Sequence, residues 1–441
     1  MPELDPLTDR LERLRRLMDQ AATRATEASR DAPMGARSSA DSPANLNIEE
    51  LVDGETVTVG GSSCFVKRSV LAIGHRHGRF PLGMALSIDA PAIHWLAGAS
   101  GSSAADLRGA VFLDIETTGL SHGTGTLAFL VGLATFEDNA LLVDQYLMRS
   151  PQEETALLEL VSGAAHGREL VVSFNGKAFD VPILETRFTL SRRRCPLPYD
   201  HVDLLMGARR VWRTRLESCR LSELERQVLG VTRLEDVPGW LVPQLYFDYL
   251  RTGDARNMVA VLDHNLLDVL SLVTLAGRLG TLYQQPHLAL EDDPHDLVAL
   301  GKAFERWPHS ADCEDRRLSS TCYTLALQHG LTETEMWATR LRLACLHKRR
   351  REWPEAVAHW QSLAEVPNRP VKLAALVELA KHAEHQTRDY ERAYEHTQEA
   401  LADAAKGSAE QARLEHRLAR LRRRMAREEA TRRADTAACR P

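Results

Sequence analysis

Two carboxylates share one face of the apolar stretch VFLDIETTGL, residues 111–120. This stretch predicts a buried strand, and because side chains alternate along a strand, Asp114 and Glu116 lie on the same face. Ionised carboxylates at the end of a buried strand repel each other and lose hydration, so they persist only when hydrogen-bonded, protonated or bound to a cation. The pair therefore predicts a metal site. The alternative is a strand that ends at Ile115, with Glu116 and Thr117 in a solvated turn.

A second acid, Asp180, follows another apolar run in SFNGKAFDVPILE. Asn175 and Gly176 predict a turn after that run, and Asp180 stands just before a predicted helix. Pro182 is typical of the start of a helix, so Asp180 on its own is also explained as a helix cap.

A third site lies in HNLLDVLSL, where leucines and a valine flank Asp268. Helical geometry cannot easily turn this side chain to water, and His264 lies four residues earlier on the same helical face. On its own, the pair could be an internally satisfied hydrogen bond. Taken together, the three sites come in the order expected if they converge on one edge of a sheet.

The elements around these sites alternate between strands and helices. We predict strands at 111–116, 127–136, 141–148, 169–175 and 199–205, with helices at 152–167 and about 178–190. Three strands, helix, strand, helix, strand is the order of the ribonuclease-H-like fold. The predicted fold class is therefore α/β, with a ribonuclease-H-like five-stranded mixed sheet flanked by helices, followed by an all-α helical-repeat domain.

The three sites together resemble the DEDD exonuclease superfamily of this fold, whose motifs are DxE, an Asn followed by Phe-Asp, and His or Tyr before Asp. The strings DIETTGL, SFNGKAFDVPIL and HNLLDVLSL resemble specifically the YprB-like predicted exonucleases. The helical insert DLL…RRVW…L…E…LG…PG is similar to theirs as well. The resemblance covers about residues 50–285.

The resemblance implies a two-metal-ion 3′–5′ exonuclease that hydrolyses phosphodiester bonds at the ends of single-stranded DNA or RNA. Asp114, Glu116, Asp180 and Asp268 would hold two Mg²⁺ or Mn²⁺ ions, and His264 would accept the proton of the attacking water. The spacing of four between His264 and Asp268 is that of the tyrosine subgroup, whereas five is usual in the histidine subgroup. The role of His264 as the base therefore stays open at this stage.

The remaining site residues are expected to bind substrate. By resemblance, Thr117, Thr118 and Leu120 would hold the terminal nucleotide at its 3′ end. Asn175 and Phe179 belong to the second motif, and Lys177 within it is the basic residue expected near phosphate.

The predicted organisation has four segments. They are a helix and flexible linker (1–47), a small β-containing lead-in (48–105), the ribonuclease-H-like exonuclease domain (106–285) and tetratricopeptide-like helical repeats with a charged C-terminal helix (290–441). The repeats rest on EWPEAVAHWQSLAEV and DYERAYEHTQEALAD, in which Trp353 and Tyr390 are 37 positions apart. Ala356 and Ala393 match in phase.

Composition limits the partners and the location. A net charge of −6 gives no global attraction to polyanions, so nucleic-acid contacts must come from local basic patches such as RRR at 192–194 or the arginines around Trp212. Solvated helix faces are the alternative for both clusters. Seven cysteines without a CxxC pair, a charged N-terminus and no apolar run of roughly 18 residues predict a cytoplasmic protein with no membrane partner.

Two other functions remain as alternatives. One is a helical-repeat adaptor that binds a protein partner through its C-terminal repeats and carries a vestigial nuclease domain. The other is a metal-dependent endonuclease. The presence of all four acids favours an active enzyme, because a vestigial site has no need to retain costly buried carboxylates.

Overall fold

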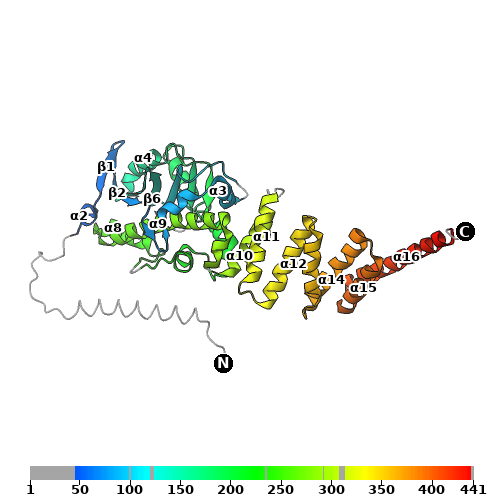
Figure 1. Ribbon diagram of the computed structural model, residues 1–441. Helices are drawn as coiled ribbons and strands as arrows, with labels where there is room; N and C mark the ends of the chain where they lie inside the picture. The colour runs from blue at the N-terminus through cyan, green and yellow to red at the C-terminus, as the bar shows by residue number, and fades with distance from the viewer. Residues whose placement is uncertain are drawn as a thin grey trace, which may run out of the picture. The chain divides into compact units, whose positions relative to one another are not determined.

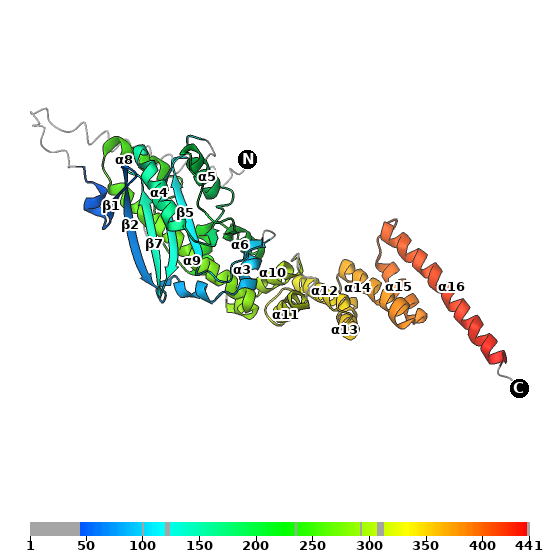
Figure 2. The ribbon, with the colours of Figure 1, turned by 90° about the horizontal axis from the view of Figure 1, so that it is seen from above.

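Seven strands form a mixed sheet in the computed structural model, which describes residues 45–98, 101–119, 124–233, 236–291, 293–306 and 313–438. The strands are β1 (Glu55–Val59), β2 (Ser62–Ala72), β5 (Ala110–Thr117), β6 (Ala128–Glu137), β7 (Ala140–Leu147), β8 (Leu170–Ser173) and β9 (His201–Asp203), in the order β1-β2-β7-β6-β5-β8-β9. Figure 2 shows β1, β2 and β7 side by side, with β5 further along the sheet. The predicted ribonuclease-H-like mixed sheet is confirmed.

The sheet is wider than the five strands predicted, because β1 and β2 of the lead-in join its antiparallel edge. β2 pairs with β7 from Phe65 opposite Leu147 to Ala72 opposite Ala140. Gly60 and Gly61, both with positive φ, form the two-residue turn between β1 and β2. A separate two-stranded piece, β3 (Arg76–His77) and β4 (Phe80–Pro81), follows β2.

The middle of the sheet sets which side chains meet at its edge. β6 and β7 form the predicted hairpin, with Asp138 at φ 48° in the turn. β5, β8 and β9 are parallel, so their carboxyl ends lie at the same edge. The loops that follow these three strands are therefore brought together in space.

Helices cover both faces of the sheet (Figure 1). They include α2 (Ile48–Leu51), α3 (Ala90–Ala97), α4 (Glu154–Ala165), α5 (Asp180–Leu190), α6 (Leu204–Trp212), α7 (Leu221–Leu224), α8 (Val242–Thr252) and α9 (Arg256–Gln284), with short 3-10 or π turns at Leu82–Ser87, Pro151–Glu153, Glu225–Leu229 and Pro286–Glu291. Phe112 and Val172 face a core shared with α3, α6 and most of α9, whereas Leu113 and Val171 face a core shared with α4, α5 and α8. Because alternate residues of β5 enter different cores, Asp114 lies on the α9 side.

The 29-residue helix α9 is long and apolar enough by length and composition to cross a membrane, with a window of mean hydropathy 1.6. A window of this kind was not expected from the sequence. However, 61% of it is buried inside the protein, where Val269, Leu272 and Leu275 belong to the core against the sheet. One such helix, mostly buried, is what the core helix of a globular protein looks like.

The C-terminal part consists of further helices. They are α10 (Pro294–Glu305), α11 (Cys313–Gln328), α12 (Glu333–Arg349), α13 (Trp353–Ala364), α14 (Arg369–His382), a π turn (Ala383–Thr387), α15 (Tyr390–Asp403) and α16 (Ala409–Ala438). Arg351 and Arg388, 37 positions apart, both have positive φ just before α13 and α15. Ala356 and Ala393 occupy equivalent, fully buried places in these two helices. The internal repeat is therefore present, while its kinship with tetratricopeptide repeats stays a prediction.

The first of these helices pack into the core of the sheet. Trp212 Nε1 donates to Asp296 Oδ2 at 3.0 Å, and Arg215 Nε donates to Asp296 Oδ1 at 2.8 Å. Leu297, Leu300 and Phe304 of α10 and Cys322 and Ala326 of α11 belong to the same hydrophobic cluster as Phe112 and Val172. From Leu46 onward the chain packs as one unit.

Candidate active site

Strand β5 carries the first two acids to the edge of the sheet. It runs to Thr117, so the alternative in which the strand ends at Ile115 is wrong. Its pairing with β6 shifts register between Glu116 and Thr117. Such β-bulges re-aim side chains and are frequent beside active sites. Asp114 and Glu116 therefore point to the α9 side immediately before the strand changes direction.

Helix α9 fixes Asp114 through a residue that the sequence analysis did not select. Asn265 Nδ2 donates to Asp114 Oδ2 at 2.8 Å, and Gln145 Nε2 donates to Asn265 Oδ1 at 3.0 Å. Both amides are fully buried. Gly132 lies opposite Asp114 on β6, and a Cβ there would stand 2.3 Å from Asn265 Oδ1. Because Gly132 has no side chain, the Asn265 amide can lie against β6 and reach Asp114.

The loop after β8 brings Asp180 to the same edge. Asp203, at the end of β9, accepts hydrogen bonds from the backbone N–H of Asn175 at 2.7 Å and of Lys177 at 3.3 Å. Asn175 has φ 63°, the left-handed conformation that asparagine tolerates. Asp180 is the first residue of α5, and the N-cap position belongs to Phe179. The helix-cap alternative for Asp180 is therefore wrong.

His264 lies between a supporting carboxylate and the acid cluster. Its Nδ1 is 2.8 Å from Asp236 Oδ1. Its Nε2 is 3.5 Å from Asp268 Oδ2 and 3.8 Å from Glu116 Oε1. If Nδ1–H donates to Asp236, the lone pair of Nε2 faces the acids. The alternative of a self-contained His264–Asp268 pair is not what the structure has, because each residue has another, shorter contact.

Arg233 is the second partner of Asp268. Its guanidinium binds Asp268 and Glu225 through Nη2, and Nη1 donates to Asp236 Oδ2 at 2.9 Å. Nη1 also lies 3.3 Å from His264 Nδ1. The side chain of Arg233 is only 10% exposed. One buried cation therefore links three carboxylates, of which Asp236 contacts Nδ1 of His264 and Asp268 lies beside Nε2.

Burial and mutual repulsion favour the protonated form of the acids. Burial is the largest cause that raises the pKa of Asp114 and of Glu116 well above their usual values, and the negative charge of Asp268 is the next. Burial, together with the charges of Asp203 and Asp268, raises the pKa of Asp180 to about 7. These shifts place all four predicted acids in one electrostatic cluster, since each of the other three feels Asp268.

The donor atoms of the cluster suit a divalent cation. Glu116, His264 and Asp268 each offer one ligand atom, and these atoms lie within 4.8 Å of one another. The carboxylates repel one another, and this repulsion raises their pKa values. A divalent cation bound between them would attract each carboxylate instead. The residues present therefore fit a divalent cation, with His264 in the ligand group in place of the predicted Asp114 and Asp180.

The predicted substrate-binding residues have different surroundings. Thr118 Oγ1 accepts from the N–H of Leu127 at 3.0 Å, and Thr117 Oγ1 donates to the carbonyl of Gly119 at 2.8 Å, so both hydroxyls stabilise the loop after β5. Phe179 is 38% exposed, beside Asp180. Burial lowers the pKa of Lys177. Leu120 lies outside the described residues.

The fold and the acid cluster define a member of the ribonuclease H class, and residues 111–280 match the family model of the RNase H superfamily. The chain belongs to this superfamily. Among curated proteins it is similar to the uncharacterized protein YprB of Bacillus subtilis (strain 168), with 33% identity over 350 residues that cover 78% of this chain and 81% of YprB.

One solved structure that is similar is the family B DNA polymerase from the hyperthermophilic archaeon Pyrobaculum calidifontis. The likeness covers 49% of this chain and 29% of the polymerase, at 16% identity and a TM-score of 0.32.

Proposed function

We propose that this protein is a divalent-metal-dependent exonuclease that removes nucleotides from the 3′ end of single-stranded DNA or RNA. The observation that carries the proposal is the arrangement of His264, whose Nδ1 is held by Asp236 while Nε2 faces Glu116 and Asp268. A proton acceptor beside a cluster of metal-binding acids is what water-driven phosphodiester cleavage requires.

Two Mg²⁺ or Mn²⁺ ions would be held by Asp114, Glu116, Asp180 and Asp268. Carboxylate oxygens are the ligands that these hard cations take. When bound, such ions supply charge stabilisation at the attacking and leaving oxygens of the phosphodiester.

The residues around the ligands have separate tasks. His264 accepts the proton of the attacking water at Nε2, and Asp236 holds the ring and stabilises its charged form. Asn265 keeps Asp114 in one orientation through the bond to Oδ2. A general base of this kind contributes about 10²- to 10⁴-fold in rate.

Recognition of the terminal nucleotide falls to the rim of the site. The partly exposed ring of Phe179 offers a surface on which a base can stack, an interaction of about 1–3 kcal/mol. Lys177, in the same loop, supplies a positive charge for a phosphate. Thr117 and Thr118 fix the backbone directly after β5 through their hydroxyls.

The test uses 5′-labelled linear single strands and closed circular single strands of DNA and RNA, each with Mg²⁺ or Mn²⁺. We expect linear strands to shorten from the 3′ end and circles to remain intact. Asp114→Asn should abolish hydrolysis while the protein stays folded. Cleavage of the circles would replace the proposal by an endonuclease.

Binding of the ions is measured separately from cleavage. Mg²⁺ or Mn²⁺ should raise the melting temperature, since a ligand at a hundredfold excess over its Kd stabilises the native state by about 2.7 kcal/mol. The rise should be much smaller for Asp114→Asn. Neither cleavage nor a thermal shift in the wild type would favour the adaptor with a vestigial nuclease domain.

A further inference from the structure

A basic cavity of about 600 Å³ lies between α6, α10 and α12. Six cationic side chains line it: Arg209, Arg210, Arg213, Lys302, Arg306 and Arg342. The described residues of its wall include no carboxylate. A cavity of this size with one sign of charge concentrates the electrostatic potential and attracts anions.

Four of these six cationic side chains make no hydrogen bond or ion pair with the part of the chain that the structure describes. They are Arg209, Arg213, Lys302 and Arg306. Arg342 donates to Glu305 Oε2 at 2.9 Å. Burial lowers the pKa of Lys302, and repulsion from Arg342 and Arg306 adds to this effect, while the carboxylates of Glu305 and Glu335 oppose it. The cavity therefore holds positive charge that an anionic ligand would stabilise.

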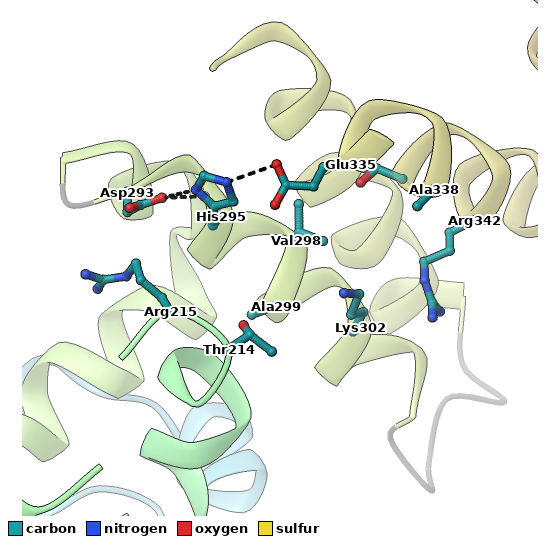
Figure 3. A pocket seen from close by; sticks show the side chains of 11 residues that line it. Thr214, Arg215, Asp293, His295, Val298, Ala299, Lys302, Glu335, Ala338 and Arg342 are labelled. Carbon is teal, nitrogen blue, oxygen red and sulfur yellow. Dashed lines mark hydrogen bonds and ion pairs between the residues drawn. The ribbon is translucent and has the colours of Figure 1, made fainter. Parts of the chain in front are cut away.

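An adjoining cavity of about 470 Å³ has a different character (Figure 3). It shares Lys302 and Arg342 with the basic cavity, but its acids are already paired. His295 lies 2.5 Å from Asp293 and 3.2 Å from Glu335. Apart from Lys302, which lines both cavities, the cationic side chains without a described hydrogen bond or ion pair lie on the side formed by α6 and the end of α10: Arg209, Arg213 and Arg306.

The position of α6 connects this cavity to the candidate active site. The helix begins directly after Asp203, which holds the loop that carries Lys177 and leads to Asp180. Arg209 and Arg213 lie on one helical face, about 8 Å and 14 Å along the axis from Leu204 at 1.5 Å per residue. The cations thus follow the helix away from the edge where the acids meet.

We infer that this cavity binds the phosphodiester backbone of a single-stranded nucleic acid whose 3′ end lies in the acid cluster. The inference rests on the proposed function and extends it, because α10 and α12 then form part of the substrate path. The backbone phosphates supply the negative charges that the cavity lacks, without any requirement for a base sequence.

The experiment compares full-length wild type with Arg213→Glu combined with Lys302→Glu. The matched control combines Arg392→Glu with Arg413→Glu, which changes the net charge equally at side chains 75% and 76% exposed on α15 and α16. A milder pair, Arg213→Gln with Lys302→Gln, covers the case in which charge reversal disturbs folding. Circular dichroism melts check the fold of every variant.

Binding is measured by fluorescence anisotropy without divalent ions, so the readout does not depend on cleavage. The probe is a labelled single strand of about 20 nucleotides, longer than the roughly 4–16 nucleotides that a single-strand-binding fold occupies. We expect Kd to rise about tenfold or more in the charge-reversed variant and little in the control, and the salt slope to fall by about 0.7 per lost phosphate contact.

Cleavage supplies the second readout. With Mg²⁺ or Mn²⁺, the cavity variants should show a higher KM for the long strand, with kcat unchanged, and a smaller rise in KM for a trinucleotide, which spans less of the path. Equal binding by a folded cavity variant and the wild type, or no binding of either nucleic acid by the wild type, would overturn the inference. Binding that depends on the cavity without any cleavage would sink the proposed nuclease and leave the binding site standing.

Discussion

Asn265 Nδ2 donates to Asp114 Oδ2 across 2.8 Å, although the two residues are 151 positions apart in the chain. The bond crosses from α9 to β5 over Gly132, which has no side chain to obstruct it. Asp114 is consequently held by the helix that also carries His264 and Asp268. The relative positions of the first and third motifs depend on this buried amide.

Gly132→Ala should displace the Asn265 amide and weaken both folding and catalysis. The new Cβ would lie 2.3 Å from Asn265 Oδ1, and the buried amide has little room to move. We expect a loss of about 1–3 kcal/mol in the free energy of unfolding, because a buried hydrogen bond is broken, with a marked loss of hydrolysis. Gly163→Ala in α4 meets nothing within 4 Å and serves as the control. Equal urea unfolding curves for the two variants would contradict the role of Gly132.

His264→Ala should lower the hydrolysis rate by about 10²- to 10⁴-fold, because it removes the proton acceptor. Asp236→Ala should cause a smaller loss, since Nε2 remains but the ring is no longer held through Nδ1. Asp263→Ala, a neighbour on α9 whose acid pairs with Lys67 at 3.3 Å, should leave the rate unchanged. Wild-type rates in His264→Tyr would show that the imidazole is not the base.

Without divalent ions, the acid cluster should lower the free energy of unfolding as pH rises from about 4 to about 7. The pKa of Asp180 moves from 3.8 to about 7 on folding, and those of Asp114 and Glu116 also rise. In this window these three acids bind more protons in the folded protein than in the unfolded chain, so their contribution to stability decreases with pH. Buried His77 and His201, whose pKa values are lowered to about 4, contribute the opposite slope. Asp180→Asn should therefore remove part of the decrease and leave the histidine contribution in place. A saturating divalent ion should suppress the decrease in the wild type, and identical slopes for all three samples would refute the cluster.

Arg233→Gln should have opposite effects on folding and on metal binding. Removing the buried cation leaves Glu225 and Asp268 without their partner, which costs about 3–5 kcal/mol in the metal-free protein. The same loss makes the cluster more negative, so Mn²⁺ should bind more tightly in calorimetric titration. Arg226→Gln, whose side chain is 63% exposed, should change neither quantity. Weaker Mn²⁺ binding in a folded Arg233→Gln protein would contradict competition between the arginine and the ion.

The sequence predicts the strands and acids of the site because their signals are local. The apolar run before Asp114, the turn before Asp180 and the acid at Asp268 in an apolar helix each depend on a few neighbouring residues. The position of β2 at the sheet edge could not be predicted, because its partner β7 is distant in sequence and the alternation of apolar residues does not specify which strand it joins.

The residues that support the acids were missed for the same reason. Asp236 and Arg233 lie in a loop without periodicity, and their contacts with His264 and Asp268 arise only from the tertiary fold. Two signals were available for the Asn265 contact. A glycine inside the apolar strand at Gly132 is typical of close approach by another group, and a polar Asn265 in an apolar helix requires a partner.

The packing of α10 and α11 into the core of the sheet has a consequence for biosynthesis. All four acids have been synthesised once α9 is complete at Gln284. The hydrophobic cluster behind β5 is still incomplete at that point, because Phe304 and Ala326 have not yet been added. At about 5–20 residues per second, the ribosome needs roughly 2–8 s more to add the missing helices. Until then the nascent chain lacks the residues of α10 and α11 that complete the hydrophobic face behind β5, and Trp212 is without its partner Asp296. The time needed to translate α10 and α11 thus determines when the sheet edge that carries the acids can first fold completely.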